Sequence, residues 1–337
     1  MKRLDIKQQN VLVAAFLVIL GAWLALPGYV QANTEKRGSN SIRGRFSLEI
    51  LGGYGMSNPS DLNRFVDADN SYQNFVYDDY FDYLLSKGSI EGWTKNNIGE
   101  RKKIKNVLPL GIRVRYGLFD FLAVSIGFQY YQRNHSDDLT FQYNRDEFYD
   151  EEYIEDLFYK PYGLSVKAYL PTVGLHVYKH IGQNLTAEAY VFGGPLFAEC
   201  SYSSDWAYNW YIQGPGYTWL TYESEGFLEY DGSGTGISVE AGGRIGFQLS
   251  RRLGFFLEGG YAYQTVSSLS GSGKEINDGL TETWEGEWKT KPEMLTAVWG
   301  TLNIKVPTNY QTNREGLENF KLDLSGFRIK VGISWLF

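Results

Sequence analysis

The chain has 337 residues and a formal net charge of -7, so it lacks the basic surface that a nucleic-acid partner requires. Its single cysteine, Cys200, excludes an intrachain disulfide framework and a zinc-thiolate site. Aromatic residues make up 16% of the chain and glycine contributes 38 residues, which suits strands with one apolar face and aromatic residues at membrane interfaces. We therefore expect no nucleic-acid partner, no metal and no cofactor.

Residues 1–32 have the pattern of a secretory signal peptide. Lys2, Arg3 and Lys7 precede an apolar run from Val11 to Leu26, and small residues ending at Ala32 form a cleavage site. We expect cleavage after Ala32; a retained anchor helix is the alternative. No other apolar run reaches the ~18 residues of a membrane helix, so a membrane position after export requires a β-barrel.

The remaining chain has no linker or compositional break, and we expect one domain. Residues 33–42 are predicted to form a short periplasmic N-terminal segment, and residues 43–337 an outer-membrane β-barrel. An alternating strand covers residues 43–56. Hairpins follow at 108–128, 174–191 and 237–263, each with two alternating strands around a short turn.

The last strand, Phe327–Phe337, completes eight antiparallel strands, an even number that is typical of outer-membrane barrels. The alternative is a ten-stranded barrel with a further hairpin from residues 217–230 or 295–306. The connections at 57–106, 134–162, 203–235 and 267–325 are long, which is rare in a compact soluble domain. We expect them to be extracellular loops, because the hairpin turns of such barrels are periplasmic.

The final strand also has the alternation of a membrane strand, and at ~3.3 Å per residue its eleven residues span roughly the tilted path across a bilayer. An ordinary half-buried strand of a soluble sandwich is the alternative. We predict a C-terminal insertion signal formed by its apolar positions: Phe327, Ile329, Val331, Ile333, Trp335 and Phe337.

Charged residues of both signs gather on one face of nearly every strand, and the other face is almost free of them. In a soluble sandwich the charged face would lie outside, whereas in a membrane barrel it faces the lumen. We predict a lumen charge network of ten residues: Glu49, Arg113, Arg115, Lys167, Glu188, Glu240, Arg244, Glu258, Arg328 and Lys330.

The alternation changes phase near Leu170-Pro171 and near Gly193-Gly194-Pro195, which counting from the Gly182 turn places at similar heights. Because proline is tolerated at bulges, we expect a paired distortion in this hairpin. A bend is the favoured interpretation, and a lateral opening in the wall is the alternative.

With this strand plan and the terminal Phe337, the chain resembles the small eight-stranded outer-membrane barrels of the OmpA, OmpX and OmpW kind. The segment Gly53-Tyr54-Gly55 and the following Asn58 to Asn63 are similar to the first loop entry of some barrels of this group. The resemblance implies outer-membrane lipid, lipopolysaccharide and the barrel-insertion machinery as partners. It also implies a charged interior network, but no specific activity.

The interior of an eight-stranded barrel is only wide enough for side chains to fill, so opposite charges there are expected to pair and plug the lumen. A narrow pore or channel for small apolar or ionic solutes is the alternative. The segment 203–235 is rich in aromatic residues and suits an extracellular ligand, although packing of the segment on itself is the favoured interpretation. The candidate ligand surface consists of Trp206, Trp210, Tyr217 and Trp219.

Enzyme chemistry has weak support in the sequence, and we expect no enzymatic activity. His176 and His180 lie roughly 13 Å apart on one strand and cannot bind one metal together. The run His135-Ser136-Asp137-Asp138 contains the residue types of a rim hydrolase, but adjacent strand residues point in opposite directions. The function predicted is that of an envelope-structural or surface-interaction protein.

Overall fold

The computed structural model describes residues 43–64, 66–67, 80–88, 92–96, 102–147, 151–181, 184–214, 217–277, 279–290, 303–304 and 318–337. The predicted signal peptide and the segment 33–42 lie outside these residues. Within the described ranges, no helix has the length and apolar character needed to cross a membrane.

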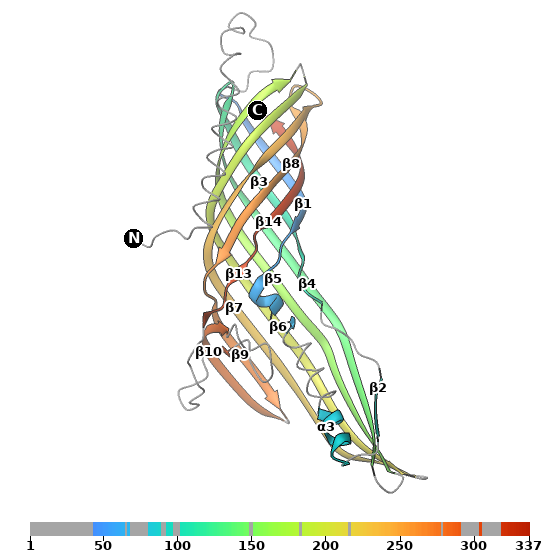
Figure 1. Ribbon diagram of the computed structural model, residues 1–337. Helices are drawn as coiled ribbons and strands as arrows, with labels where there is room; N and C mark the ends of the chain where they lie inside the picture. Colours follow the sequence, from blue (N-terminus) through green and yellow to red (C-terminus); the bar gives the residue numbers. More distant parts are fainter. Residues whose placement is uncertain are drawn as a thin grey trace, which may run out of the picture.

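Eight strands close into an antiparallel ring in the order β1-β3-β4-β5-β6-β7-β8-β14, and β14 pairs with β1 (Figure 1). The prediction of eight ring strands is therefore confirmed. The ring strands are β1 (Phe46–Met56), β3 (Asn106–Phe119), β4 (Leu122–Glu147), β5 (Glu151–Ile181), β6 (Leu185–Gly214), β7 (Tyr217–Gln248), β8 (Leu253–Val266) and β14 (Gly326–Leu336). The segment 217–230 of the ten-stranded alternative is part of β7.

The short turns lie at one end of the ring, as expected from the hairpin pattern. They connect β3 to β4, β5 to β6 and β7 to β8. Both ends of the barrel chain meet at this turn end, where the Phe337 amide donates to the Phe46 carbonyl oxygen at 2.8 Å. The C-terminal strand therefore closes the ring against the first strand.

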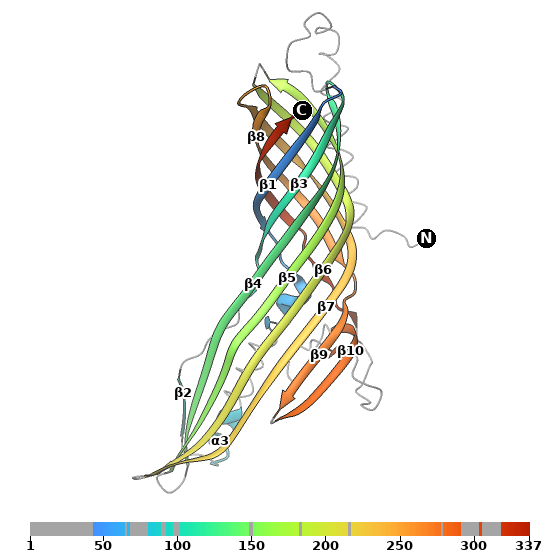
Figure 2. The ribbon, with the colours of Figure 1, turned by 180° about the vertical axis from the view of Figure 1, so that it is seen from behind.

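Two of the four predicted loops are strands, which corrects the prediction for residues 134–162 and 203–235. β4 and β5 stay paired out to Glu147 and Glu151, and β6 and β7 out to Gly214 and Tyr217. These four strands continue past the other ring strands as a curved sheet, which we call the extension (Figures 1 and 2). These segments lie between the predicted hairpins and were therefore expected to be loops, but their aromatic residues favour strands wherever a neighbouring strand is available to pair with them.

The other two connections, 57–105 and 267–325, contain short elements. The first holds helical residues at 60–64 and 66–67, helix α3 (Tyr80–Ser86) and β2 (Gly92–Asn96), which pairs with the extension part of β4. The second holds β9 (Ser270–Asn277) and β10 (Leu280–Thr290), a hairpin that adds to β7 outside the ring. Its remaining short strands are β11 (Asn303–Ile304), β12 (Glu318–Asn319) and β13 (Leu322–Asp323).

The outer face of the ring is apolar. Ile126, Val173 and Ile329 are 65%, 63% and 59% exposed, and similar residues cover every ring strand between two bands of aromatic side chains. The turn-side girdle includes Phe46, Tyr116, Phe247, Phe255 and Trp335, and the extension-side girdle includes Tyr54, Tyr130, Tyr169, Phe197, Tyr261 and Phe327.

Along β7, the span from Phe247 to Ile237 at ~3.3 Å per residue and a tilt of ~35–45° gives a band roughly 25 Å tall. That height matches the apolar band of outer-membrane barrels. The charged faces point inward, so the alternative of a soluble sandwich is wrong. The chain is a transmembrane β-barrel of the outer-membrane type.

The change in alternation on β5 and β6 does not come from a bulge. Tyr169 pairs with Phe197 and Val173 with Gly193 in one register, with an interruption of the ladder between them. Gly194 lies so close to the Pro171 carbonyl oxygen that a Cβ there would be 2.0 Å from it. The expected distortion is thus a local gap in pairing, and the inward-facing positions keep the same parity on both sides of it.

Candidate functional site

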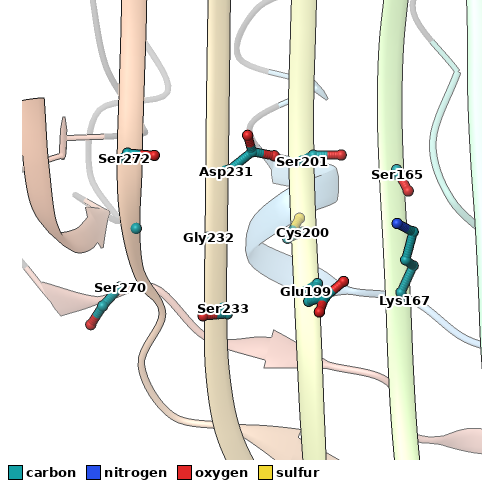
Figure 3. A pocket seen from close by; sticks show the side chains of 11 residues that line it. Ser165, Lys167, Glu199, Cys200, Ser201, Asp231, Gly232, Ser233, Ser270 and Ser272 are labelled. Atoms are coloured by element: carbon teal, nitrogen blue, oxygen red, sulfur yellow. The ribbon is translucent and has the colours of Figure 1, made fainter. Parts of the chain in front are cut away.

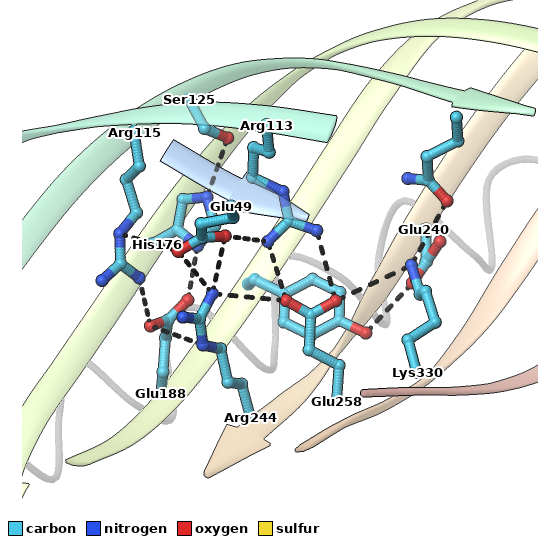
Figure 4. A network of polar contacts seen from close by, with 12 residues as sticks. Glu49, Arg113, Arg115, Ser125, His176, Glu188, Glu240, Arg244, Glu258 and Lys330 are labelled. Carbon is cyan, nitrogen blue, oxygen red and sulfur yellow. Dashed lines mark hydrogen bonds and ion pairs between the residues drawn. The ribbon is translucent and has the colours of Figure 1, made fainter. Parts of the chain in front are cut away.

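The barrel interior within the apolar band is filled by charged side chains (Figure 4). The ring strands place nine of the ten predicted charges there: Glu49, Arg113, Arg115, Glu188, Glu240, Arg244, Glu258, Arg328 and Lys330. Lys167 is the exception, and its assignment to the network is corrected. It is directly opposite Glu199 on the outer face of the barrel, beyond the extension-side girdle.

Arg113 connects strands that are not neighbours in the ring. Its guanidinium donates to both carboxylate oxygens of Glu258 at 2.7 and 3.2 Å, and to Glu49 at 3.1 Å. Because β3 and β8 are separated by two strands, this bidentate pair crosses the lumen. Two parallel hydrogen bonds fix the geometry as well as the charge.

Arg244 on β7 is the most highly connected cation of the layer. Its guanidinium nitrogens lie 2.9 Å from Glu49, 3.4 Å from Glu258 and 3.8 Å from Glu188. The guanidinium carbon also lies 3.7 Å from the centroid of the Phe256 ring. Three carboxylates therefore share one cation, and an aromatic face covers it.

Two further pairs complete the layer. Arg115 donates to Glu188 at 2.6 Å near the turn end, and the Lys330 ammonium lies 2.6 Å from Glu240 on the extension side. The layer has equal numbers of opposite charges: Glu49, Glu188, Glu240 and Glu258 face Arg113, Arg115, Arg244 and Lys330. This balance satisfies the requirement that buried charges be paired.

Arg328 is held differently from the other cations. Its guanidinium donates to the backbone oxygens of Met56 at 2.6 Å and of Leu324, and to the Gln264 side chain at 3.4 Å. Gln264 in turn donates to the Tyr131 hydroxyl at 3.0 Å. This polar cluster holds the end of the connection 267–325 against the ring strands.

Sequence reasoning missed a chain of three groups in the charge layer. The Ser125 hydroxyl lies 2.8 Å from His176 Nε2, and His176 Nδ1 lies 2.5 Å from Glu188. Serine, histidine and carboxylate in this order are the groups of a hydrolase triad. Ser125 is only 5% exposed and His176 is fully buried, which leaves no room for an acyl group at the hydroxyl.

Beyond the charge layer, an apolar plug fills the outer mouth of the ring. Ring residues such as Leu170, Leu196 and Val266 meet side chains from the connections, including Leu62 and Phe320, and all are almost fully buried. Trp288, also buried, lies edge-on to Phe320 with centroids 5.5 Å apart. The lumen is therefore occupied by charged pairs within the band and by apolar side chains at its outer mouth.

Cys200 lies in this plug on the extension side, outside the apolar band. Burial raises the pKa of its thiol to about 12, and the carboxylate of Asp231 adds to the increase. A thiol that stays protonated is a poor nucleophile. Cys200 is therefore a packing residue of the plug.

The other predicted site residues lie elsewhere. Trp206 and Trp210 are on β6, and Tyr217 and Trp219 on β7, so they belong to extension strands and not to a loop. The side chains of the three tryptophans lie outside the described residues. The six residues of the predicted insertion signal all face outward from β14 and the C-terminal residue, with 44–70% of their surface exposed.

The rim run His135 to Asp138 lies on β4, and only the His135 side chain is among those described. Within the described part of the chain, no three His, Cys, Asp or Glu side chains come close enough to hold a metal ion.

No family model matches the sequence, and no curated protein matches it. Among solved structures, the chain is similar to the outer membrane protein OprG from Pseudomonas aeruginosa, with a TM-score of 0.32, 11% identity, and coverage of 88% of this chain and 97% of that chain. It is also similar to the outer membrane protease OmpT from Escherichia coli, with a TM-score of 0.25, 7% identity, and coverage of 87% and 97%. At these TM-scores neither likeness supports a functional argument, and the fold rests on the strand pairings.

Proposed function

We propose that this chain is an integral protein of a bacterial outer membrane in which the barrel is a closed anchor and the extension is the working surface. Its role would then be that of an envelope-structural or surface-interaction protein. One observation carries the proposal: the lumen is filled across the ring by balanced charges and an apolar plug, while four strands continue beyond it.

The outer-membrane location is supported by the apolar band and by the end at which the turns lie. Outer-membrane barrels place short turns on the periplasmic side, so the extension would face the cell exterior. The outward alternation from Phe327 to Phe337 is the signal that we expect the barrel-insertion machinery to bind.

The size of the extension supports a role at the surface. Residues 201–214 of β6 alone reach roughly 43 Å along the strand at ~3.3 Å per residue. A barrel that served only as an anchor would not require strands of this length. The aromatic side chains of Trp206, Trp210, Tyr217 and Trp219 remain candidates for an extracellular ligand, because aromatic residues bind sugar faces and apolar molecules.

Single-channel recording tests the closed lumen. The mature chain, without residues 1–32, is refolded into detergent, its folding is checked by heat-modifiable migration on a gel, and it is added to a planar bilayer. We expect a silent membrane from the folded barrel. Steady current steps would show that the lumen conducts and would overturn the anchor proposal.

Shortening the extension tests whether the barrel folds as an anchor without it. Replacing residues 139–159 and residues 206–226 by two-residue turns cuts both hairpins at positions that are paired across the strands. We expect a barrel that still folds, with an unfolding midpoint close to that of the full chain. Failure to fold would show that the extension is a folding element and would argue against a separate working surface.

The second candidate function is a gated pore. Arg244 lies within 4 Å of three glutamates, so its pairs can exchange without leaving a carboxylate far from a cation. Charge reversal by Arg244→Glu separates the two functions. Loss of the folded barrel is the result expected for a static core, whereas a folded variant with raised conductance would support the gate.

A further inference from the structure

β10 (Leu280–Thr290) forms an edge of the sheet that continues beyond the ring (Figures 1 and 2). On one side it pairs with β9 without interruption from Leu280 to Glu287. Its other described partners, β11 and β12, reach only residues 288–290. In the described part of the chain, the outer edge of β10 is therefore unpaired over residues 280–287, whereas β2 covers part of the opposite edge of the sheet, on β4.

The backbone of this free edge is regular and open to solvent. Every second residue of an edge strand turns its N–H and C=O groups away from the sheet, so residues 280–287 present about four such residues. This stretch lacks the proline, lysine and bulges that commonly protect edge strands. Its residues of described burial are exposed, apart from the half-buried Gly286. The edge is therefore suited to accept a further strand.

The free edge is acidic on both faces of the sheet. Because side chains alternate along β10, Glu285 and Glu287 share the outer face, and Glu282 lies on the inner face opposite Glu275 of β9. Burial raises the pKa of Glu275, and the Glu282 carboxylate adds to the increase. Residues 270–287 contain five carboxylates and one lysine, Lys274. A cation placed beside Glu282 would relieve the repulsion between the two strands.

The adjoining outer face of the sheet has the same sign of charge. A polar recess of about 410 Å³ lies where β5, β6, β7 and β9 run side by side (Figure 3). Its lining includes the carboxylates of Glu199 and Asp231 but only one ammonium group, that of Lys167. Ser272, which also lines the recess, is the cross-strand partner of Glu285. Negative charge therefore extends from the recess to the free edge, and it attracts a cationic partner.

We infer that the free edge of β10 binds an extended basic segment of a partner protein as an additional antiparallel strand. The inference rests on the proposed role of the extension as an interaction surface, but not on whether the lumen is closed. A second copy of this chain is disfavoured as the occupant, because it would bring the same three carboxylates of β10 to the edge, and like charges on neighbouring strands repel.

Strand register specifies the pattern of the partner. In an antiparallel strand, the residues opposite Glu287, Glu285 and Glu282 occupy the first, third and sixth positions of a stretch. Basic residues at these positions would pair with the carboxylates on both faces of the sheet. The backbone hydrogen bonds supply affinity in this mode of recognition, and the side-chain pairs supply specificity.

The test measures fluorescence anisotropy of a labelled peptide titrated onto the folded mature barrel in detergent. The peptide consists of threonine and valine with lysine at its first, third and sixth positions. A control peptide of the same composition has the last lysine moved to the fifth position, where it would lie opposite Thr283 on the outer face and not opposite Glu282. Both peptides have the same charge, so a difference between them reports register.

We expect saturable binding that is roughly two- to fivefold weaker for the control peptide, because one cross-strand pair is lost. N-methylation of the odd or of the even positions gives two further peptides. Only one set of amides faces the edge, so one peptide should lose binding and the other should keep it. Equal affinities of the two lysine peptides, or equal effects of the two methylation patterns, would overturn the inference.

A variant of the protein tests the charges of the edge. Glu282→Gln/Glu285→Gln should bind the peptide roughly three- to tenfold more weakly, because two pairs are lost. The matched control, Asp205→Asn/Glu225→Gln, removes two exposed charges from β6 and β7 and should stay within twofold of wild type. An equal loss in the two variants would overturn the inference.

Self-association and conductance are measured on the same preparations. Dimerisation of the barrel that the peptide does not displace would assign the edge to a second copy and overturn the inference. A silent barrel that binds no peptide would overturn it and leave the anchor proposal standing. A conducting barrel that binds the peptide in the expected register would support the inference and refute the closed anchor.

Discussion

The same strands have a polar inner face and an apolar outer face in the membrane part of the barrel, and the reverse beyond it. On β6 within the band, Glu188 faces inward and Val191 outward; beyond the extension-side girdle, Cys200 faces inward and Glu199 outward. The parity of the strand does not change between the two parts. Only the surroundings change, from lipid around a polar interior to water around an apolar one.

The difference shows that alternation in the sequence indicates which residues share a face of a strand, but not which face is the inner one. A lipid-facing surface must be apolar, and the narrow lumen then takes the charged residues, which have to pair. Past the headgroups, burial of apolar side chains again stabilises the interior. The membrane part of the barrel and the part beyond it should therefore respond differently to the same substitution.

The largest expected effect comes from breaking the charge layer. Arg113→Met removes the bidentate partner of buried Glu258 and one hydrogen bond to buried Glu49, and should lower the free energy of unfolding by roughly 3–5 kcal/mol. Urea unfolding in lipid vesicles measures this loss, with heat-modifiable migration on a gel as the readout of the folded fraction. The control, Lys103→Met, breaks the half-exposed pair with Asp67 and should cost about 0–1 kcal/mol. An equal loss of unfolding free energy in the two variants would contradict the difference between the membrane part of the barrel and the part beyond it.

The apolar plug gives the next largest effect. Leu196→Ala removes a fully buried side chain and should cost about 2–5 kcal/mol in the same unfolding assay. Leu280→Ala, at a 76% exposed position on β10, is the control with little expected change. The Leu196 variant should remain silent in a planar bilayer, because the charge layer still fills the lumen. Conductance in this variant would show that the plug alone seals the barrel.

Introducing a charge on the outer face of β4 shows whether that position contacts lipid or water. Ile126→Arg places a cation in the middle of the apolar band and should cost ~2–4 kcal/mol. Asn134→Arg, on the same face of β4 but beyond the extension-side girdle, should change stability by less than ~0.5 kcal/mol. If both variants refold from urea with the same midpoint, the position assigned to the membrane is wrong.

A smaller effect is expected in the β9–β10 hairpin, which lies outside the membrane. Burial first, and then the directly opposite Glu282 carboxylate, raise the pKa of Glu275. Because the pKa of Glu275 is raised in the folded state, its contribution to stability is present below the unfolded pKa of about 4.3 and is lost as pH rises. The hairpin should therefore be less protected at pH 7 than at pH 4.

Glu282→Gln removes the cross-strand repulsion and should stabilise the hairpin by ~0.2–1 kcal/mol at pH 7. Amide hydrogen exchange of β9 and β10, corrected for intrinsic rates, measures the change. The difference between variant and wild type should shrink at pH 4, where the carboxyl group of Glu275 is protonated. A difference that does not vary with pH would assign the effect to another contact.

The smallest expected effect is none at all. Although Ser125, His176 and Glu188 have the order of a hydrolase triad, their burial should prevent reaction with a fluorophosphonate probe. Labelling of the folded barrel is followed by gel fluorescence, with Ser125→Ala as the control. Labelling that disappears in Ser125→Ala would establish a reactive serine and replace the assignment of a static charge layer.

Much of the barrel could be predicted from local pattern. Alternation and turn chemistry identified the eight ring strands, and the outward positions of Phe327 to Phe337 follow from a period of two. The same period places nine of the ten predicted charges on the inward face of the ring strands. Lys167 lies on the outer face because, beyond the extension-side girdle, the outer face of β5 meets water and is the polar one.

The sequence by itself determined the strands, their two faces and which charges share a face, because these depend on residues close together in the chain. The tertiary structure alone decided how far β4 to β7 continue and where the faces exchange roles. It also decided which glutamate Arg113 or Arg244 meets across the lumen. Those features depend on contacts between distant segments and on the boundary between lipid and water, neither of which has a signature in local periodicity.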